Sequence, residues 1–179
     1  FRIRNGRVDY RTRWVKSERF VANDKARKQL FPMYRNPYMD DPRAKGLSRS
    51  TANTHVINHK WLILALKEDS PPVALDLNTL ETVDPVYTFN GQLPLDRAFT
   101  AHPKVCSKTG NIVAFGYEAD GFGSASVAFF EIDKAGKKVV WSCDPMHGNT
   151  VTASTGHKTR PFQRVKEEVE RFFDIHSDL

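Results

Sequence analysis

The stretch 108–132, KTGNIVAFGYEADGFGSASVAFFEI, decides the fold class. Two apolar runs in it, 112–117 and 126–132, have the length of β-strands and are rich in Val, Ile and Phe. The segments before and between them contain Gly with Asn or Asp, residues that favour tight turns. The stretch therefore predicts two consecutive antiparallel strands.

The same pattern continues on both sides of this stretch. Asn5-Gly6 predicts a hairpin turn, and the alternation from Val8 to Trp14 is typical of a strand with one solvated face. Further strands are predicted at 55–57, 61–66, 73–75, 87–89 and 139–141, with breaks that include Asn58-His59-Lys60 and Ser70-Pro71-Pro72. Short apolar runs separated by frequent turns predict an all-β, antiparallel protein.

Two stretches predict helices instead. A short helix is expected at 24–30, before Pro32, and a longer one at 161–175, where Pro161 suits the first helical position. The longer helix has one apolar face, formed by Phe162, Val165, Val169, Phe172 and Phe173. The expected organisation is a β-rich region at 1–145, a linker at 146–159 rich in Gly, Ser, Thr and His, and a helical tail at 160–179.

The composition is that of a globular protein, with 40% hydrophobic and 27% charged residues in a chain of 179. The net charge of +6 is concentrated in residues 1–60, which hold 15 Lys and Arg against 5 Asp and Glu. Because the arginines alternate along the predicted hairpin as on a solvated strand, no nucleic-acid partner is predicted. The sequence contains neither an apolar run long enough for a transmembrane segment nor an apolar signal core at its start, so a cytoplasmic location is expected.

One hexapeptide and four ordered blocks carry a family resemblance. The hexapeptide is FTAHPK at 99–104, and the blocks are TANT at 51–54, LALKED at 64–69, LD at 75–76 and TLET at 79–82. Through them residues 1–145 resemble the carotenoid cleavage oxygenases, non-haem iron dioxygenases that split a carbon-carbon double bond into two carbonyl products. The resemblance implies a seven-bladed β-propeller as the parent fold. This chain would then be a fragment, a partial β-propeller of antiparallel blades with a C-terminal helix.

The resemblance also implies a metal site. The family holds Fe(II) with four histidines, and neutral imidazole suits ferrous iron. His102 matches the first ligand. His147, in the segment MHGNTVT at 146–152, resembles the second, although the separation is a few residues short and Gly148 and Asn149 depart from the family pattern.

The other histidines are not assigned to the metal. His157 and His176 follow His147 too closely for the third ligand and are expected on the surface. His55 stands where stilbene-cleaving relatives often have Asn, and His59 falls in a predicted turn. The chain would supply at most two of the four ligands, so the isolated chain is not expected to be an efficient enzyme.

Two blocks resemble the stilbene-cleaving branch of the family, namely LALKED and YRNP at 34–37. By that resemblance, Lys67 and Tyr34 contact the 4-hydroxyl of the substrate, with Tyr38 as the alternative tyrosine. A cation and a hydroxyl donor would stabilise a phenolate oxygen there. Glu68 matches a glutamate that accepts a hydrogen bond from the outer nitrogen of an iron-bound histidine, which fixes the orientation of the ring.

The resemblance therefore predicts an Fe(II)-dependent dioxygenase. Its reaction would cleave the central double bond of a 4-hydroxystilbene, of the resveratrol or lignostilbene type, with dioxygen to give two aromatic aldehydes. One alternative is a carotenoid or apocarotenoid substrate. Another, from a different class, is a non-catalytic interaction domain derived from a β-propeller.

Overall fold

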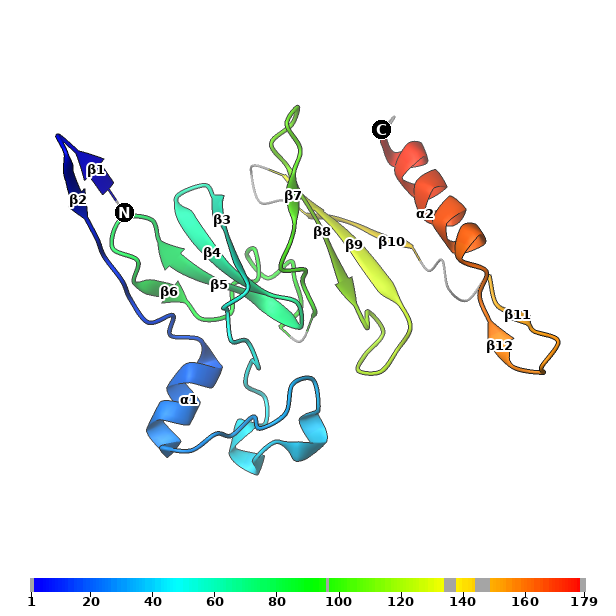
Figure 1. Cartoon of the computed structure of the whole chain (residues 1–179), viewed down its shortest axis with the longest axis horizontal. Helices are drawn as coiled ribbons and strands as arrows, with labels where there is room; N and C mark the ends of the chain where they lie inside the picture. Colours follow the sequence, from blue (N-terminus) through cyan, green and yellow to red (C-terminus); the bar gives the residue numbers. More distant parts are fainter. Residues whose placement is uncertain (1, 96, 134–137, 144–148, 178–179) are drawn as a thin grey trace. The chain divides into compact units, whose positions relative to one another are not determined.

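The chain folds into two compact units, Phe1–His102 and Pro103–Leu179. The computed structural model describes residues 2–95, 97–133, 138–143 and 149–177. Each unit contains a four-stranded antiparallel sheet whose strands follow one another in chain order (Figure 1). Such a meander is the blade unit of a β-propeller, and the prediction of an antiparallel all-β fold is confirmed.

The sheet of the first unit consists of β3 (His55–His59), β4 (Leu62–Lys67), β5 (Ser70–Asp76) and β6 (Thr82–Asp84). β5 is buried except at its last residue, and β4 is buried at 64–66 and partly buried elsewhere, which matches their nearly continuous apolar sequence. The core on this sheet contains Ala52, Ala65, Val73 and Leu75, with Val15 and Ile63 packed against it. Packing of the central strands in this core fixes where β4 ends, and thereby positions the side chains at that end of the strand.

The sheet of the second unit consists of β7 (Lys104–Val105), β8 (Ile112–Tyr117), β9 (Val127–Ile132) and β10 (Lys138–Cys143). The stretch 108–132 forms the predicted pair, with Phe115 opposite Phe129. A small hairpin, β11 (Val151–Thr152) and β12 (Lys158–Thr159), follows. Helix α2 (Phe162–Ser177) confirms the predicted C-terminal helix.

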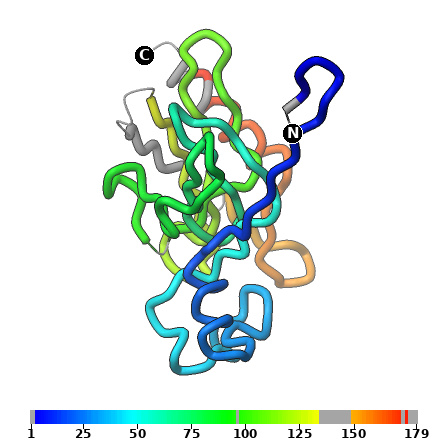
Figure 2. The backbone as a smooth tube through the Cα atoms, turned by 90° about the vertical axis from the view of Figure 1, so that its left-hand side faces the viewer, coloured from blue at the N-terminus to red at the C-terminus, as the bar shows by residue number. Residues whose placement is uncertain are grey.

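The N-terminal segment of the first unit begins with a hairpin of β1 (Arg2–Arg4) and β2 (Arg7–Asp9). Asn5 and Gly6 both have positive φ, 49° and 72°, as the predicted two-residue turn requires. Helix α1 (Glu18–Ala26) and the short 3-10 helices η1 (Pro37–Met39) and η2 (Pro42–Ala44) lie together, away from this hairpin (Figures 1 and 2). Leu30, Phe31 and Ala44 form a second buried core there.

The first helix differs from its predicted position of 24–30. It begins at Glu18 because the Ser17 hydroxyl caps it, accepting a hydrogen bond from the Phe20 N–H at 3.2 Å. It ends at Ala26, and the capping residue Arg27 adopts a left-handed conformation with φ 50°. Serine is a preferred N-cap residue, and Ser17 could therefore have indicated the start of this helix from the sequence.

Two predicted breaks and one predicted strand were also wrong in detail. Ser70-Pro71-Pro72 begins β5 and is no break; prolines are tolerated there because they stand at the start of the strand, next to an irregularity in its register. His59 is the last residue of β3 and lies before the turn. Residues 87–89 are not a strand, since Phe89 has a positive φ of 51° and turns the chain.

None of the helices within the described ranges combines the length and the apolar character that a membrane crossing requires.

Candidate metal and substrate site

Lys67 is the last residue of the buried strand β4, and its side chain is only 18% exposed. The Nζ atom lies 3.3 Å from Oε2 of Glu68, the next residue in the chain. It also lies 4.7 Å from the centroid of the Tyr34 ring, above the ring face. A cation in that position is attracted by the ring electrons, which contributes about 0.5 to 2 kcal/mol. The structure thus brings Lys67, Glu68 and Tyr34 together.

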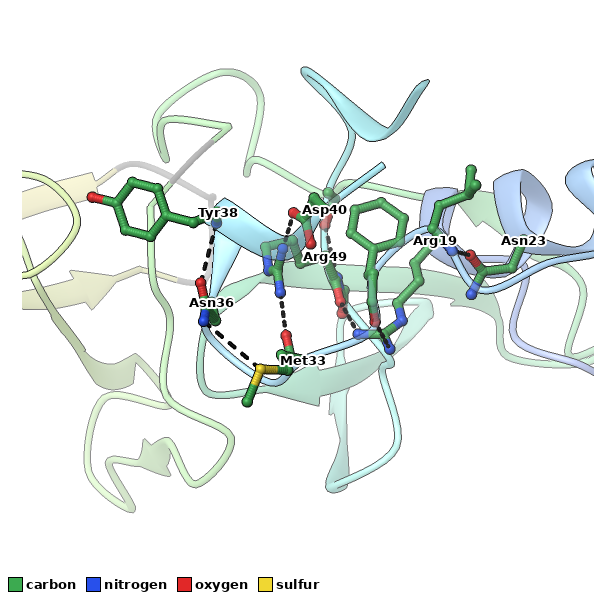
Figure 3. Close-up of polar contacts among 11 residues, drawn as sticks. Arg19, Asn23, Met33, Asn36, Tyr38, Asp40 and Arg49 are labelled. Carbon is green, nitrogen blue, oxygen red and sulfur yellow. Dashed lines mark hydrogen bonds and ion pairs between the residues drawn. The ribbon is translucent and has the colours of Figure 1, made fainter. Parts of the chain in front are cut away.

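Tyr34 comes from the segment between α1 and η1, and its position depends on Arg49. Nη2 of Arg49 donates a hydrogen bond to the backbone carbonyl of Met33, at 2.5 Å, and Nη1 forms an ion pair with Asp40 (Figure 3). The Arg49 guanidinium also lies over the ring of the fully buried Phe31, 5.6 Å from its centroid. The residue that precedes Tyr34 therefore forms a hydrogen bond with a partly buried cation.

Arg19 contacts the ring of Phe31 as well. Its guanidinium lies 5.4 Å from the Phe31 centroid, and Nη2 donates to the Phe31 carbonyl at 2.9 Å. Tyr38, the alternative tyrosine, is 86% exposed, and its backbone N–H donates to Oδ1 of Asn36 at 3.2 Å. Of the two tyrosines, Tyr34 is the one that the structure places on Lys67.

His102 follows a buried run at 98–101, in which Phe99 and Ala101 are fully buried. The ring of Phe99 packs on Phe89 with centroids 5.7 Å apart, and the His102 N–H donates to Oγ1 of Thr100 at 3.0 Å. The imidazole itself is 63% exposed, and its Nε2 lies 3.8 Å from Oε1 of Glu68. The buried run thus presents His102 to solvent beside the predicted glutamate.

The carboxyl pKa values of the two residues in the β4–β5 turn shift in opposite directions. Burial raises the pKa of the Glu68 carboxyl, but the hydrogen bond from its own backbone N–H, Lys67 and His102 outweigh this effect and lower it overall. Burial raises the pKa of Asp69, although the charges of Lys67 and Arg49 oppose the change. Glu68 is therefore a carboxylate at neutral pH, available to a cation or to an imidazole N–H.

His55 lies at this site, although the sequence analysis did not assign it. It stands at the start of β3, directly opposite Leu66 of β4. Its ring centroid is 5.6 Å from that of His102, with 33° between the ring planes. The pairing of the predicted strands 55–57 and 61–66 across a short turn was the signal that could have placed it there.

The other histidines lie elsewhere or outside the description. His59 is 6% exposed, its ring meets Phe89 edge-on at 5.7 Å, and burial lowers its pKa. His157 is exposed, as predicted. His147 lies outside the described residues, and so does the side chain of His176.

Imidazole and carboxylate donors suit divalent transition metals, so the chemistry of this site fits the predicted Fe(II). Within the part of the chain that the structure describes, no group of three or more His, Cys, Asp or Glu side chains is arranged to hold a metal ion. The described portion of the predicted iron site therefore consists of His102 with Glu68 beside it.

Four-stranded antiparallel meanders of this kind are the blade unit of β-propeller proteins, and here a carboxylate that follows the central strand β4 lies beside a histidine. The sequence profile described as retinal pigment epithelial membrane protein matches residues 1–166. The chain belongs to this family, the carotenoid cleavage oxygenases, whose members are metal-dependent oxygenases.

Named relatives agree with this assignment. The chain is 46% identical over 137 residues to isoeugenol monooxygenase of Pseudomonas nitroreducens, covering 76% of this chain and 28% of that protein. It is 46% identical over 148 residues to resveratrol cleavage oxygenase 1 of Aspergillus fumigatus, covering 82% and 29%. The crystal structure of Pseudomonas brassicacearum lignostilbene dioxygenase is similar with a TM-score of 0.62 and 42% identity, over 70% of this chain and 25% of that one. The chain thus spans between a quarter and a third of the length of these relatives.

A shorter stretch of the chain is similar to an enzyme that is not named as an oxygenase. Over 49 residues, 27% of this chain, the sequence is 51% identical to the phospho-2-dehydro-3-deoxyheptonate aldolase AroG of Mycolicibacterium smegmatis. The similarity covers 11% of that aldolase.

Proposed function

We propose that this chain is a segment of an Fe(II)-dependent dioxygenase that cleaves the central double bond of a 4-hydroxystilbene, of the resveratrol or lignostilbene type, to two aromatic aldehydes. The observation that carries the proposal is the placement of Lys67. A lysine that is only 18% exposed, at the end of a buried strand and 4.7 Å from the centroid of a tyrosine ring, is positioned to receive an anionic oxygen. The names of the relatives support a phenolic substrate.

In this proposal each residue has a separate task. The Lys67 ammonium and the Tyr34 hydroxyl would hold the substrate's 4-oxygen as a phenolate, because a cation and a donor both lower the energy of that anion. A phenolate para to the vinyl bridge pushes electron density into the double bond and makes it easier to oxidise. Glu68 would orient the His102 imidazole by accepting from its ring N–H. Bound iron would supply the activation of dioxygen.

The proposed iron ligands in this chain are His102 and His147. His147→Ala would lower the iron content if His147 is a ligand and leave it unchanged if it is not. With 11% of the aldolase covered, no aldolase activity is proposed.

Two alternatives remain distinct. A carotenoid or apocarotenoid substrate would need no phenolate contact, and the Neurospora crassa relative, 45% identical over 150 residues, is named carotenoid cleavage oxygenase 1. A non-catalytic interaction domain would bind no iron. The cytoplasmic location stays a prediction.

The test is Lys67→Met in a full-length protein that carries this segment. We expect kcat/KM for a 4-hydroxystilbene to fall about tenfold to a hundredfold, the range for a lost hydrogen bond to a charged group, with little change for the 4-methoxy analogue. The control is Lys60→Met, which removes an exposed lysine from the β3–β4 turn of the same sheet. Unchanged cleavage of the phenol in Lys67→Met would refute the phenolate role.

A further inference from the structure

Tyr34 stands at the corner of a tight turn formed by residues 33–36. The Asn36 N–H donates to the Met33 carbonyl at 3.5 Å, and Arg35 has a positive φ of 52°. Side chains other than Gly and Asn seldom adopt this conformation, so the turn needs support from its surroundings. Tyr34 itself is exposed, and packing in the core does not fix its ring. The direction of the ring therefore depends on how the backbone of this turn is held.

Two arginines hold the backbone that leads into the turn. Nη2 of Arg49 donates to the Met33 carbonyl at 2.5 Å (Figure 3). Nη2 of Arg19 donates to the Phe31 carbonyl at 2.9 Å, two residues earlier. Nη1 of Arg19 also reaches the backbone carbonyl of Arg49, at 3.4 Å. The two guanidinium groups thus bind alternate carbonyls of the segment 31–33 and are linked to each other.

The guanidinium groups are themselves fixed in place. Both lie over the ring of the fully buried Phe31, 5.4 Å and 5.6 Å from its centroid. Nη1 of Arg49 forms an ion pair with Asp40. A planar guanidinium presents a rigid fork of donors and stacks on an aromatic ring, whereas a lysine ammonium is a point charge on a flexible stem. Lysine at position 49 would therefore keep the charge and lose the fixed geometry.

We propose that Arg49, together with Arg19, positions Tyr34 against Lys67 and thereby sets the affinity for a phenolic substrate. Both arginines are positioning residues, which act through the turn 33–36. The inference rests on the proposed function, in which Tyr34 and Lys67 bind the 4-oxygen of the substrate. Nζ of Lys67 lies 4.7 Å from the centroid of the Tyr34 ring, so a small displacement of the turn disrupts this contact. Misplacement by about 1 Å can cost an enzyme a large part of its rate.

The first measurement is proton NMR of the 179-residue chain. The face of an aromatic ring shifts nearby protons upfield, so the Lys67 protons next to the ammonium should resonate upfield of those of an exposed lysine. Tyr34→Leu should abolish this shift, and Arg49→Lys should reduce it by about half or more. The matched control is Arg43→Lys, which changes an exposed arginine paired with Asp41 and should leave the shift intact. A full shift in a folded Arg49→Lys chain would overturn the proposal.

Two observations decide the matter if circular dichroism shows that Arg49→Lys is unfolded. Arg19→Lys removes the donor to the Phe31 carbonyl and should also reduce the upfield shift of Lys67. The unmodified chain must show the shift in the first place. An intact shift in Arg19→Lys, or no shift in the unmodified chain, would refute the proposal.

The second measurement is a double-mutant cycle on cleavage by a full-length protein that carries this segment. Arg49→Lys should lower kcat/KM for a 4-hydroxystilbene about fivefold, the equivalent of one net hydrogen bond, with little change for the 4-methoxy analogue. In a Tyr34→Phe background it should have no further effect, because both changes disturb the same contact. Equal losses for both substrates, or a further loss in that background, would show that Arg49 acts by another route and overturn the proposal.

The two measurements separate this inference from the proposed function. An intact upfield shift in Arg49→Lys refutes the positioning role and leaves the substrate contact of Tyr34 standing. A lost shift, combined with unchanged cleavage of the phenol in both Arg49→Lys and Tyr34→Phe, refutes the substrate contact of Tyr34 and with it the effect on affinity.

Discussion

Replacing Arg49 by Met should destabilise the first unit more than any other single charge removal near Tyr34. The ion pair of Arg49 with Asp40 is largely buried, with side chains 18% and 16% exposed. Removing one member of a buried pair leaves an uncompensated charge and costs about 3 to 5 kcal/mol. Because both side chains keep some exposure, we expect a loss of about 3 kcal/mol in the free energy of unfolding, about a hundredfold in the unfolding equilibrium.

The assay is urea denaturation followed by circular dichroism, with two comparison variants. Arg27→Met removes a cation whose ion pair with Asp24 is exposed, 84% and 64%, and should change the unfolding free energy by less than about 0.5 kcal/mol. The double variant Arg49→Met, Asp40→Met should recover part of the loss, since no unpaired charge remains. Equal stability of Arg49→Met and Arg27→Met, or a double variant less stable than Arg49→Met alone, would show that the buried pair does not hold this segment.

Three further changes test other parts of the same unit. Phe99→Ala removes a fully buried ring and should cost about 3 to 5 kcal/mol of unfolding free energy, and the freed His102 should lose its ring contact with His55, measured by urea denaturation and NMR. The lowered pKa of Glu68 means that its carboxylate stabilises the fold above the pKa of the unfolded chain, and this contribution is lost as the pH falls through the folded pKa. Denaturation from pH 7 to 3 should therefore show a steeper loss for the natural chain than for Glu68→Gln, and parallel curves would contradict it. For Asp69 the raised pKa gives the opposite sign, because its stability contribution is present below the unfolded pKa and lost as the pH rises through the folded pKa. Asp69→Asn should accordingly unfold at higher urea at pH 7, and the gain should vanish in acid.

The sequence predicted most clearly those features that depend on local patterns. The hairpin at Asn5-Gly6, the strand pair within 108–132 and the C-terminal helix follow from turn residues and apolar spacing. The blade-like meanders follow from the same short periods. Other features depend on burial and strand pairing, which a local pattern does not reveal. Pro71 and Pro72, for example, were predicted to be a break, but tertiary packing places them at the start of a buried strand.

The motifs named some of the residues at the candidate site. The residues that they did not name contact partners far away along the chain. Motif resemblance named Tyr34, Lys67, Glu68 and His102, and the structure places these four residues in successive contact. It could not name His55, whose neighbour His102 is 47 positions away, because that contact arises from the pairing of β3 with β4 and from the burial of 98–101. Arg49 was missed for the same reason, since its contact with Met33 spans 16 positions with no periodic pattern.

The turn between β4 and β5 contains only two residues, and each faces a different set of charges. Glu68 interacts with Lys67 and His102, whereas Asp69 interacts electrostatically with Lys67 and Arg49. Surface turns usually tolerate changes of length. Here the insertion of a single residue would carry one carboxylate into the other's place and shift every side chain after it to the opposite face of β5. The length of this turn is therefore a constraint on how such sequences can diverge, independent of which residues occupy it.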